Sequence, residues 1–207
     1  MLMRGETLND TQSTSIRELV LAAQGGDQAT WKTLVEACML AVVRWAHGLV
    51  PPGDVPDIAQ QALFNASRSL KSLREPERFY AWLKSITIHC AFEFLRKREP
   101  STPRESKSLT PGCEFIDPTA GPEEQFLRRE LRIVLTGELV RLTEQGRITK
   151  RECVVCMRML LGESMAEIAA DLEISEPTVR VHKQHVIMRL RNAPSIREIW
   201  RLWHDLP

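Results

Sequence analysis

A helix is expected to start twice within a short stretch of this chain, and this doubled start constrains the fold more than any other feature of the sequence. Ser164 precedes Glu167 by three residues, which fits a capping box that satisfies the free backbone amides of a helix start. Ser175 can cap a second helix in the same way. Two short helices joined by a tight turn predict a helix-turn-helix over residues 162–191, a motif that places its second helix in the major groove of DNA.

The second helix of this motif has two different faces. With a rotation of about 100° per residue, Val179, Val186 and Leu190 fall on one stripe that can face a core. Arg and Gln side chains outside this stripe can hydrogen-bond purine edges, and a valine can contact a thymine methyl group. An ordinary amphipathic helix with a solvated charged face is the alternative, but the two caps and the short turn favour DNA binding. The candidate DNA-binding residues are Arg180, Val181, Lys183, Gln184, His185, Arg189 and Arg191.

Composition limits the size and the kind of partner. The 207 residues are 43% hydrophobic and 27% charged, which suits one large or two small globular domains. The formal net charge is only +1, from 28 basic and 27 acidic side chains. A protein that simply coats nucleic acid is usually more basic, so we expect local basic patches beside acidic surfaces that contact protein partners.

Several features indicate a cytoplasmic protein. The first ten residues lack the apolar core of a signal peptide, and no apolar run approaches the length that spans a membrane, so we expect no membrane insertion. The cysteine count is odd and the spacing is irregular, which argues for reduced thiols and against a disulfide framework. The cysteines are Cys38, Cys90, Cys113, Cys153 and Cys156.

One pair of cysteines has an alternative interpretation. Cys153 and Cys156 form a C-x-x-C, and His182 and His185 follow as an H-x-x-H, so these four side chains match the ligand types of a tetrahedral zinc site. The two cysteines also share a helical stripe with Met157, where small buried thiols fill a core. His185 is expected on the outward, DNA-facing side of its helix. Core packing is therefore the favoured interpretation, and no cofactor is expected.

Helical periodicity extends over almost the whole chain, and there is no Asn-Gly or Asp-Gly hairpin signal. The pattern predicts an all-α fold with two small helical domains joined by a flexible linker. The first domain is expected over residues 15–98, with four helices separated by breaks near residues 25–27, 51–54 and 71–78.

The composition changes after this first domain. Residues 99–122 are rich in proline and poor in large apolar side chains, which predicts the flexible linker. Residues 123–194 are expected to form the second domain, which includes the helix-turn-helix. Residues 195–207, with Trp200 and Trp203 at helical spacing, predict an amphipathic tail that packs on the second domain, and a partner-binding role is the alternative.

Four segments together resemble a known family. They read LAAQGGDQATWKTLVE at 21–36, DIAQQALFNA at 57–66, FYAWLKSI at 79–86 and DPTAGPEE at 117–124. By their order and spacing, the chain resembles a bacterial sigma factor of the extracytoplasmic-function type within the sigma-70 family. The first domain resembles that family's region 2, and the second domain resembles its region 4.

The resemblance implies which surface meets which partner. The outer face of the helix that begins near residue 57 is implied to bind core RNA polymerase through Asp57, Gln60, Gln61, Asn65 and Arg68. The loop over residues 71–78 and the helix after it are implied to hold the minus-10 element as a single strand. The residues implied in this contact are Lys71, Arg74, Arg78, Lys84, His89, Arg96, Lys97 and Arg98. The helix-turn-helix is implied to read the minus-35 element as duplex. Gln61 stands where the family usually has an acidic residue, and His89 where it often has asparagine.

The function implied is transcription initiation. Such a factor binds core RNA polymerase, directs it to promoters through their minus-10 and minus-35 elements, and assists DNA melting. Its partners are core RNA polymerase, promoter DNA and, in this family, an anti-sigma factor.

A LuxR-like transcriptional regulator shares TVRVH at 178–182 and IMRL at 187–190, and it would bind duplex DNA without being a sigma subunit. It does not explain the first domain, which lacks the alternating strands and helices of a receiver domain. An enzyme is not expected, because the chain has no glycine-rich phosphate loop, no HExxH and no nucleophile elbow.

Overall fold

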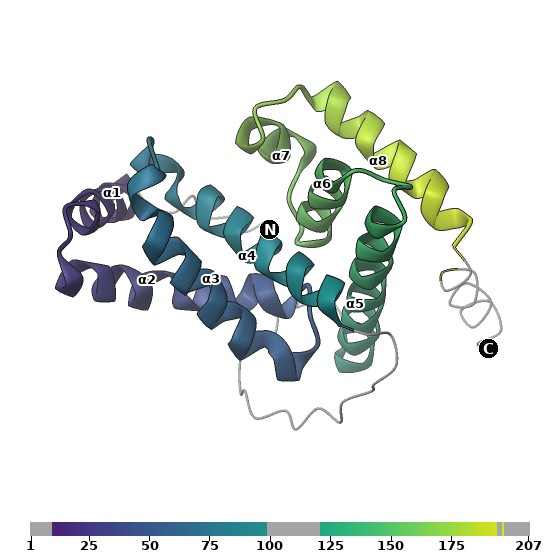
Figure 1. Cartoon of the computed structure of the whole chain (residues 1–207), viewed down its shortest axis with the longest axis horizontal. Coiled ribbons are helices and arrows are strands. Elements are labelled where there is room, and N and C mark those ends of the chain that lie inside the picture. The colour runs from purple at the N-terminus through teal and green to yellow at the C-terminus, as the bar shows by residue number, and fades with distance from the viewer. Residues whose placement is uncertain (1–9, 99–120, 194–195, 197–207) are drawn as a thin grey trace, which may run out of the picture.

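The computed structural model describes residues 10–98, 121–193 and 196. These residues form eight α-helices and three short 3-10 turns, and they contain no β-strand (Figure 1). The predicted all-α, two-domain fold is therefore confirmed. Most of the predicted linker, residues 99–120, lies outside the described residues, and so does the predicted tail except for Ile196, which is buried.

The first domain contains four α-helices, as the sequence predicted. They are α1 (Asp10–Gln24), α2 (Gln28–His47), α3 (Val55–Ser69) and α4 (Phe79–Lys97), with turns η1 (Pro52–Asp54), η2 (Leu70–Ser72) and η3 (Pro76–Arg78). An apolar stripe on α3 and the residue after it is buried, and α3 packs against both α2 and α4. This arrangement leaves the opposite face of α3 on the surface. The stripe consists of Ile58, Ala62, Ala66 and Leu70.

The connection between α3 and α4 is held in place by α1. Gln24 Nε2 donates hydrogen bonds to the backbone oxygens of Leu70 and Leu73, at 3.0 and 2.8 Å. Arg17 Nε donates to Glu77 Oε1 at 2.5 Å. Because these contacts satisfy backbone groups of a short connection, the loop has a defined shape on the surface of the domain.

The second domain contains α5 (Pro122–Glu144), α6 (Lys150–Leu160), α7 (Met165–Asp171) and α8 (Glu176–Arg191). Ser164 and Glu167 form a capping box at the start of α7, and the Ser175 side chain caps α8. The doubled helix start predicted from the sequence is thus confirmed. A small apolar cluster that includes Ile168 from α7 and Val179 from α8 holds the two helices together.

Three helices of the second domain end in the same way. The amides of Glu173 and Ile174 fold back onto carbonyl oxygens of α7, which is a Schellman motif and requires a residue with positive φ just after the helix. Gly146 after α5 and Gly162 after α6 occupy this position with φ of 66° and 86°. After α7 the position is taken by Glu173, with φ of 53°. Within the described ranges, it is the one residue other than glycine with positive φ.

The two domains pack against each other along α4, which contacts both α5 and α6 (Figure 1). Buried residues of both domains belong to one apolar cluster, which includes Phe92 of α4 and Met157 of α6. Gly48 allows a close approach, because a Cβ at this position would lie 2.7 Å from Leu161 Cδ2. Lys150 Nζ lies 5.8 Å from the centroid of the Phe92 ring. The two helical units therefore form a single packed body in this structure.

Candidate nucleic-acid and protein interfaces

The outer face of α8 presents most of the side chains that the sequence singled out. Val179 and Val186 are fully buried, as predicted, and Leu190 is partly buried. Val181 is 61% exposed, so its methyl groups are available to an apolar contact such as a thymine methyl. The exposed candidates are Arg180, Val181, Gln184, Arg189 and Arg191, whereas Lys183 and His185 are half-buried.

His185 turns toward the domain and not outward as the helical periodicity suggested. Its Nδ1 lies 2.5 Å from Oε1 of Glu152, a buried residue of α6. Its Nε2 accepts a hydrogen bond from Arg189 Nε at 3.3 Å. His182 Nδ1 lies 3.8 Å from the same Glu152 oxygen. Periodicity within α8 could not reveal this, because the partner lies 33 residues away on another helix.

The basic residues predicted for the minus-10 contact fall into different environments. Five of them are exposed on the surface of the first domain: Lys71, Arg74, His89, Arg96 and Lys97. Arg96 Nε donates to Glu93 Oε2 at 3.0 Å, which lowers the pKa of Glu93. Arg98 Nη1 donates to Oδ2 of the buried Asp54 at 2.8 Å. Arg98 therefore ties the end of α4 to turn η1, a structural contact that the sequence did not indicate.

Arg78 makes three polar contacts with the end of α7. Its Nη2 donates to the backbone oxygens of Ala170 and Asp171, at 3.1 and 2.9 Å, and its Nη1 lies 2.9 Å from Glu173 Oε1. These acceptors belong to the second domain. A cation predicted to follow a DNA backbone is therefore occupied, in this structure, by the other predicted DNA-binding domain.

Lys84 also meets the second domain. Its Nζ lies 3.0 Å from Glu163 Oε1 and 5.1 Å from the centroid of the Trp45 ring. Glu163 in turn accepts a hydrogen bond at 2.8 Å from Nε of the fully buried Arg158, which also pairs with Asp171. This chain of charges runs from the first domain into the interior of the helix-turn-helix.

The outer face of α3 carries the residues implied in polymerase binding. Asp57, Gln60, Gln61 and Arg68 are exposed. Asn65 is half-buried, and its Nδ2 donates to Cys90 Sγ at 3.3 Å.

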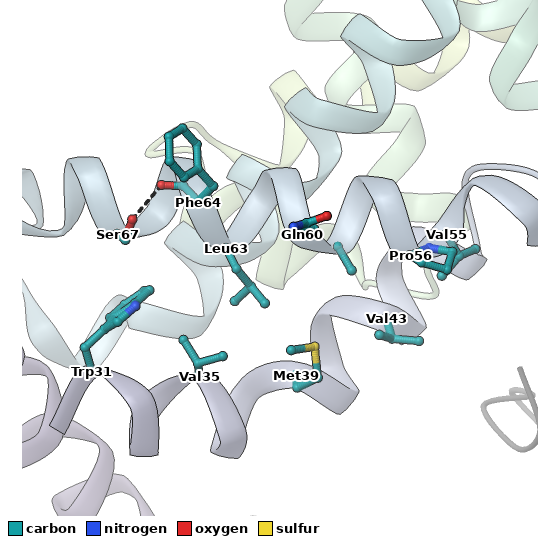
Figure 2. Close-up of a pocket in the computed structure, with 11 residues that line it drawn as sticks. Trp31, Val35, Met39, Val43, Val55, Pro56, Gln60, Leu63, Phe64 and Ser67 are labelled. Atoms are coloured by element: carbon teal, nitrogen blue, oxygen red, sulfur yellow. Dashed lines mark hydrogen bonds between the residues drawn. The ribbon is translucent and has the colours of Figure 1, made fainter. Parts of the chain in front are cut away.

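An apolar groove of about 540 Å³ runs beside this face, between α2 and α3 (Figure 2). Gln60 lines the groove, with Trp31 and Pro56 toward its two ends. Phe64 stands on the outer side of α3 and is 55% exposed, and Arg68 Cζ lies 5.7 Å from the centroid of its ring. Phe64 is a further residue of this face, and the sequence signal for it is its position between Gln60 and Arg68 on one helical stripe.

The C-x-x-C pair lies in the interior of the second domain. Burial raises the pKa of Cys153 to about 11 and that of Cys156 to about 12, so both thiols are protonated at neutral pH. His185 is held by Glu152 instead of facing these cysteines. In the part of the chain that the structure describes, no group of three or more His, Cys, Asp and Glu side chains is placed to hold a metal ion.

The fold and these surfaces define a two-domain helical protein in which the helix-turn-helix lies against the basic loop and the start of α4. Two known protein families match this chain, one in each domain. The family described as Sigma-70 region 2 matches residues 34–100. The family described as bacterial regulatory proteins, luxR family, matches residues 147–202, which cover the helix-turn-helix. None of the described helices is both long enough and apolar enough to cross a membrane.

Relatives that align over most of the chain identify its family more specifically. The ECF RNA polymerase sigma-E factor of Escherichia coli K12 is 33% identical over 181 residues, which cover 84% of this chain and 90% of the relative. The sigma-E factor of Haemophilus influenzae is 27% identical over 168 residues, which cover 78% and 86%. The chain therefore belongs to the extracytoplasmic-function family of RNA polymerase sigma factors.

A solved structure shows the same fold. CnrH, determined in complex with the cytosolic domain of CnrY, aligns with a TM-score of 0.51 at 21% identity, over 93% of this chain and 99% of CnrH. The likeness to the luxR family is confined to the second domain. It does not cover the first domain, so a LuxR-like regulator does not account for the whole chain.

Proposed function

We propose that this protein is a promoter-specificity subunit of RNA polymerase that acts in the cytoplasm and has no catalytic activity of its own. The observation that carries the proposal is membership of the sigma family over both domains, with 84% of the chain covered by one relative. In this function the first domain binds core polymerase and the minus-10 element, and the second domain binds the minus-35 element. An anti-sigma factor is a further proposed partner.

The residue assignments rest on chemistry and exposure. Arg180, Val181 and Gln184 lie exposed on α8 and offer the hydrogen bonds and the apolar contact that base edges require. Lys71, Arg74 and Lys97 lie exposed on the first domain, where they can follow a phosphate backbone.

We assign polymerase binding to the outer face of α3, with Asp57, Gln60, Gln61, Asn65 and Arg68. The exposed Phe64 in the middle of this stripe adds an aromatic side chain, a residue type that is enriched at protein interfaces. Because Gln60 also lines the apolar groove, a partner seated on α3 would cover the mouth of that groove.

The test is transcription from a promoter library by core RNA polymerase freed of other sigma factors, with and without this protein, followed by sequencing of the transcript starts. We expect starts that depend on the protein and share elements near minus 35 and minus 10. If the protein bound duplex DNA specifically but did not associate with core polymerase, the LuxR-like function would replace this one.

A further inference from the structure

Glu152 occupies an unusual position, because one buried carboxylate serves two different helices. Its Oε2 accepts hydrogen bonds from the backbone amide and the hydroxyl of Thr149, at 2.6 and 2.9 Å, and so caps the start of α6. Its Oε1 is directed at α8 and lies 2.5 Å from His185 Nδ1. Burial acts to raise the pKa of Glu152, but the hydrogen bonds from Thr149 and His185 outweigh this effect and hold the pKa below its usual value.

The contacts of His185 determine which nitrogen carries the proton. Nδ1 faces a carboxylate, which can only accept, so Nδ1 donates. Nε2 faces the Nε–H of Arg189, which can only donate, so Nε2 accepts. The donors therefore run in one direction from Arg189 through His185 and end on Glu152, which also accepts from Thr149 on its other oxygen. This line connects a cation on the outer face of α8 to the start of α6.

Apolar packing alone does not fix the rotation of α8. Val186 and Leu190 pack on the core and resist large rotations, but these apolar contacts have no direction and do not single out one exact angle of the helix. A hydrogen bond to a buried carboxylate is directional, and an unpaired carboxylate at such a site is costly. Rotation of α8 would break this bond and would also move Val181 and Gln184 relative to a bound duplex.

We propose that Glu152 is a positioning residue for minus-35 recognition, which holds Arg189 through His185 and sets the rotation of α8 against α6. The inference rests on the proposed function, because it assigns α8 the reading of duplex DNA. It differs from a capping role, which uses only the Oε2 atom.

The substitutions that test this proposal distinguish the roles of the two carboxylate oxygens of Glu152. Glu152→Gln keeps an oxygen for Thr149 but turns an amide NH2 toward His185, which reverses the hydrogen-bond order and leaves two donors facing each other at Arg189. His185→Ala removes the link and leaves the cap intact. His185→Gln restores it, because a glutamine amide can donate to Glu152 and accept from Arg189. Glu144→Gln, an exposed residue at the end of α5, controls for the lost negative charge.

The measurement is the affinity of holoenzyme, assembled from core polymerase and the full chain, for a promoter fragment selected in the library experiment and for the same fragment with its minus-35 element scrambled. Glu152→Gln and His185→Ala should each weaken binding to the intact fragment about five- to tenfold, with little change on the scrambled one. His185→Gln and Glu144→Gln should remain near wild type. Combined with Arg189→Gln, Glu152→Gln should add little further loss, because both act through one line of hydrogen bonds.

Three outcomes would overturn the inference. In the first, Glu152→Gln holoenzyme binds the intact fragment as tightly as Glu144→Gln holoenzyme. In the second, the losses of affinity from Glu152→Gln and Arg189→Gln simply add in the double variant. If Glu152→Gln lowers the melting temperature, the test rests on the His185 variants, because they keep the helix cap. The third outcome is then an equal affinity of the His185→Ala and His185→Gln holoenzymes for the intact fragment, which contradicts the inference. A wild-type holoenzyme that does not distinguish the two fragments would instead refute the proposed function, and this inference with it.

Discussion

Replacing Glu173 with glycine should stabilise the second domain while it weakens a contact between the domains. Glu173 has a φ of 53°, in the left-handed region where residues with a Cβ are strained by about 1–2 kcal/mol. Glycine removes this strain but loses about 0.5–1 kcal/mol because its unfolded chain is more flexible. The backbone terms alone should therefore raise the free energy of unfolding by about 0.5–1 kcal/mol.

The same substitution removes the ion pair with Arg78. The side chains of Arg78 and Glu173 are 31% and 78% exposed, so solvent screens the pair and limits its contribution to about 0–1 kcal/mol. Arg78 keeps its two backbone acceptors on α7. Glu173→Gln is the matched control, because it removes the charge but keeps a Cβ at the strained position.

The assay is thermal unfolding, combined with hydrogen exchange of the α7 and α8 amides to report on the second domain alone. For a chain of this size, the midpoint of Glu173→Gly should lie about 1–4 °C above that of Glu173→Gln, which also lacks the ion pair, and exchange should be slower. Glu173→Gln should give no rise. The reasoning would be refuted if Glu173→Gly unfolded at or below the temperature of Glu173→Gln.

Three further predictions concern the proposed surfaces and a helix cap. Arg180→Ala should cost about 1–3 kcal/mol in promoter affinity and relax the sequence preference near minus 35. Unchanged selectivity in the library experiment would exclude Arg180 from the residues proposed to contact the minus-35 bases. Phe64→Ser should weaken binding to core polymerase by about 1–3 kcal/mol, whereas Leu21→Ser, at a similarly exposed position on α1, should not; equal effects in a titration would contradict the assignment of α3. Hydrogen bonds from Ser164 lower the pKa of Glu167, so its contribution to stability is present above the ordinary pKa of 4.5 and is lost as the pH falls through its lower folded value. The difference in unfolding free energy between wild type and Glu167→Gln should therefore shrink below pH 4.5, and a difference independent of pH would exclude this cause.

The parts of the fold that depend on local order could be predicted from the sequence. Ser164 and Ser175 cap helices that follow directly after them, so each signal and its effect lie within one turn. The buried face of α8 follows from the helical repeat, which places Val179 and Val186 inside with full burial. These predictions needed no knowledge of how the helices pack.

The candidate site was harder to predict because long polar side chains choose partners across helices. His185, Arg78 and Lys84 each pair with an acidic residue of a distant segment, and helical periodicity carries no information on such a choice. The strained turn at Glu173 was also hidden, because its conformation follows from the Schellman motif and its residue type does not reveal it.

The contact between Arg78 and the second domain competes with the binding of a nucleic acid strand to this arginine. A nucleic acid strand that uses Arg78 must first displace the carbonyl oxygens at the end of α7. When only a fraction of the molecules is open, the apparent dissociation constant for such a strand rises by the inverse of that fraction. Each 1.4 kcal/mol or so in favour of the packed form then demands about tenfold more free ligand. Strength of packing between the domains, as well as the promoter sequence, would in this way set the concentration at which the protein engages DNA.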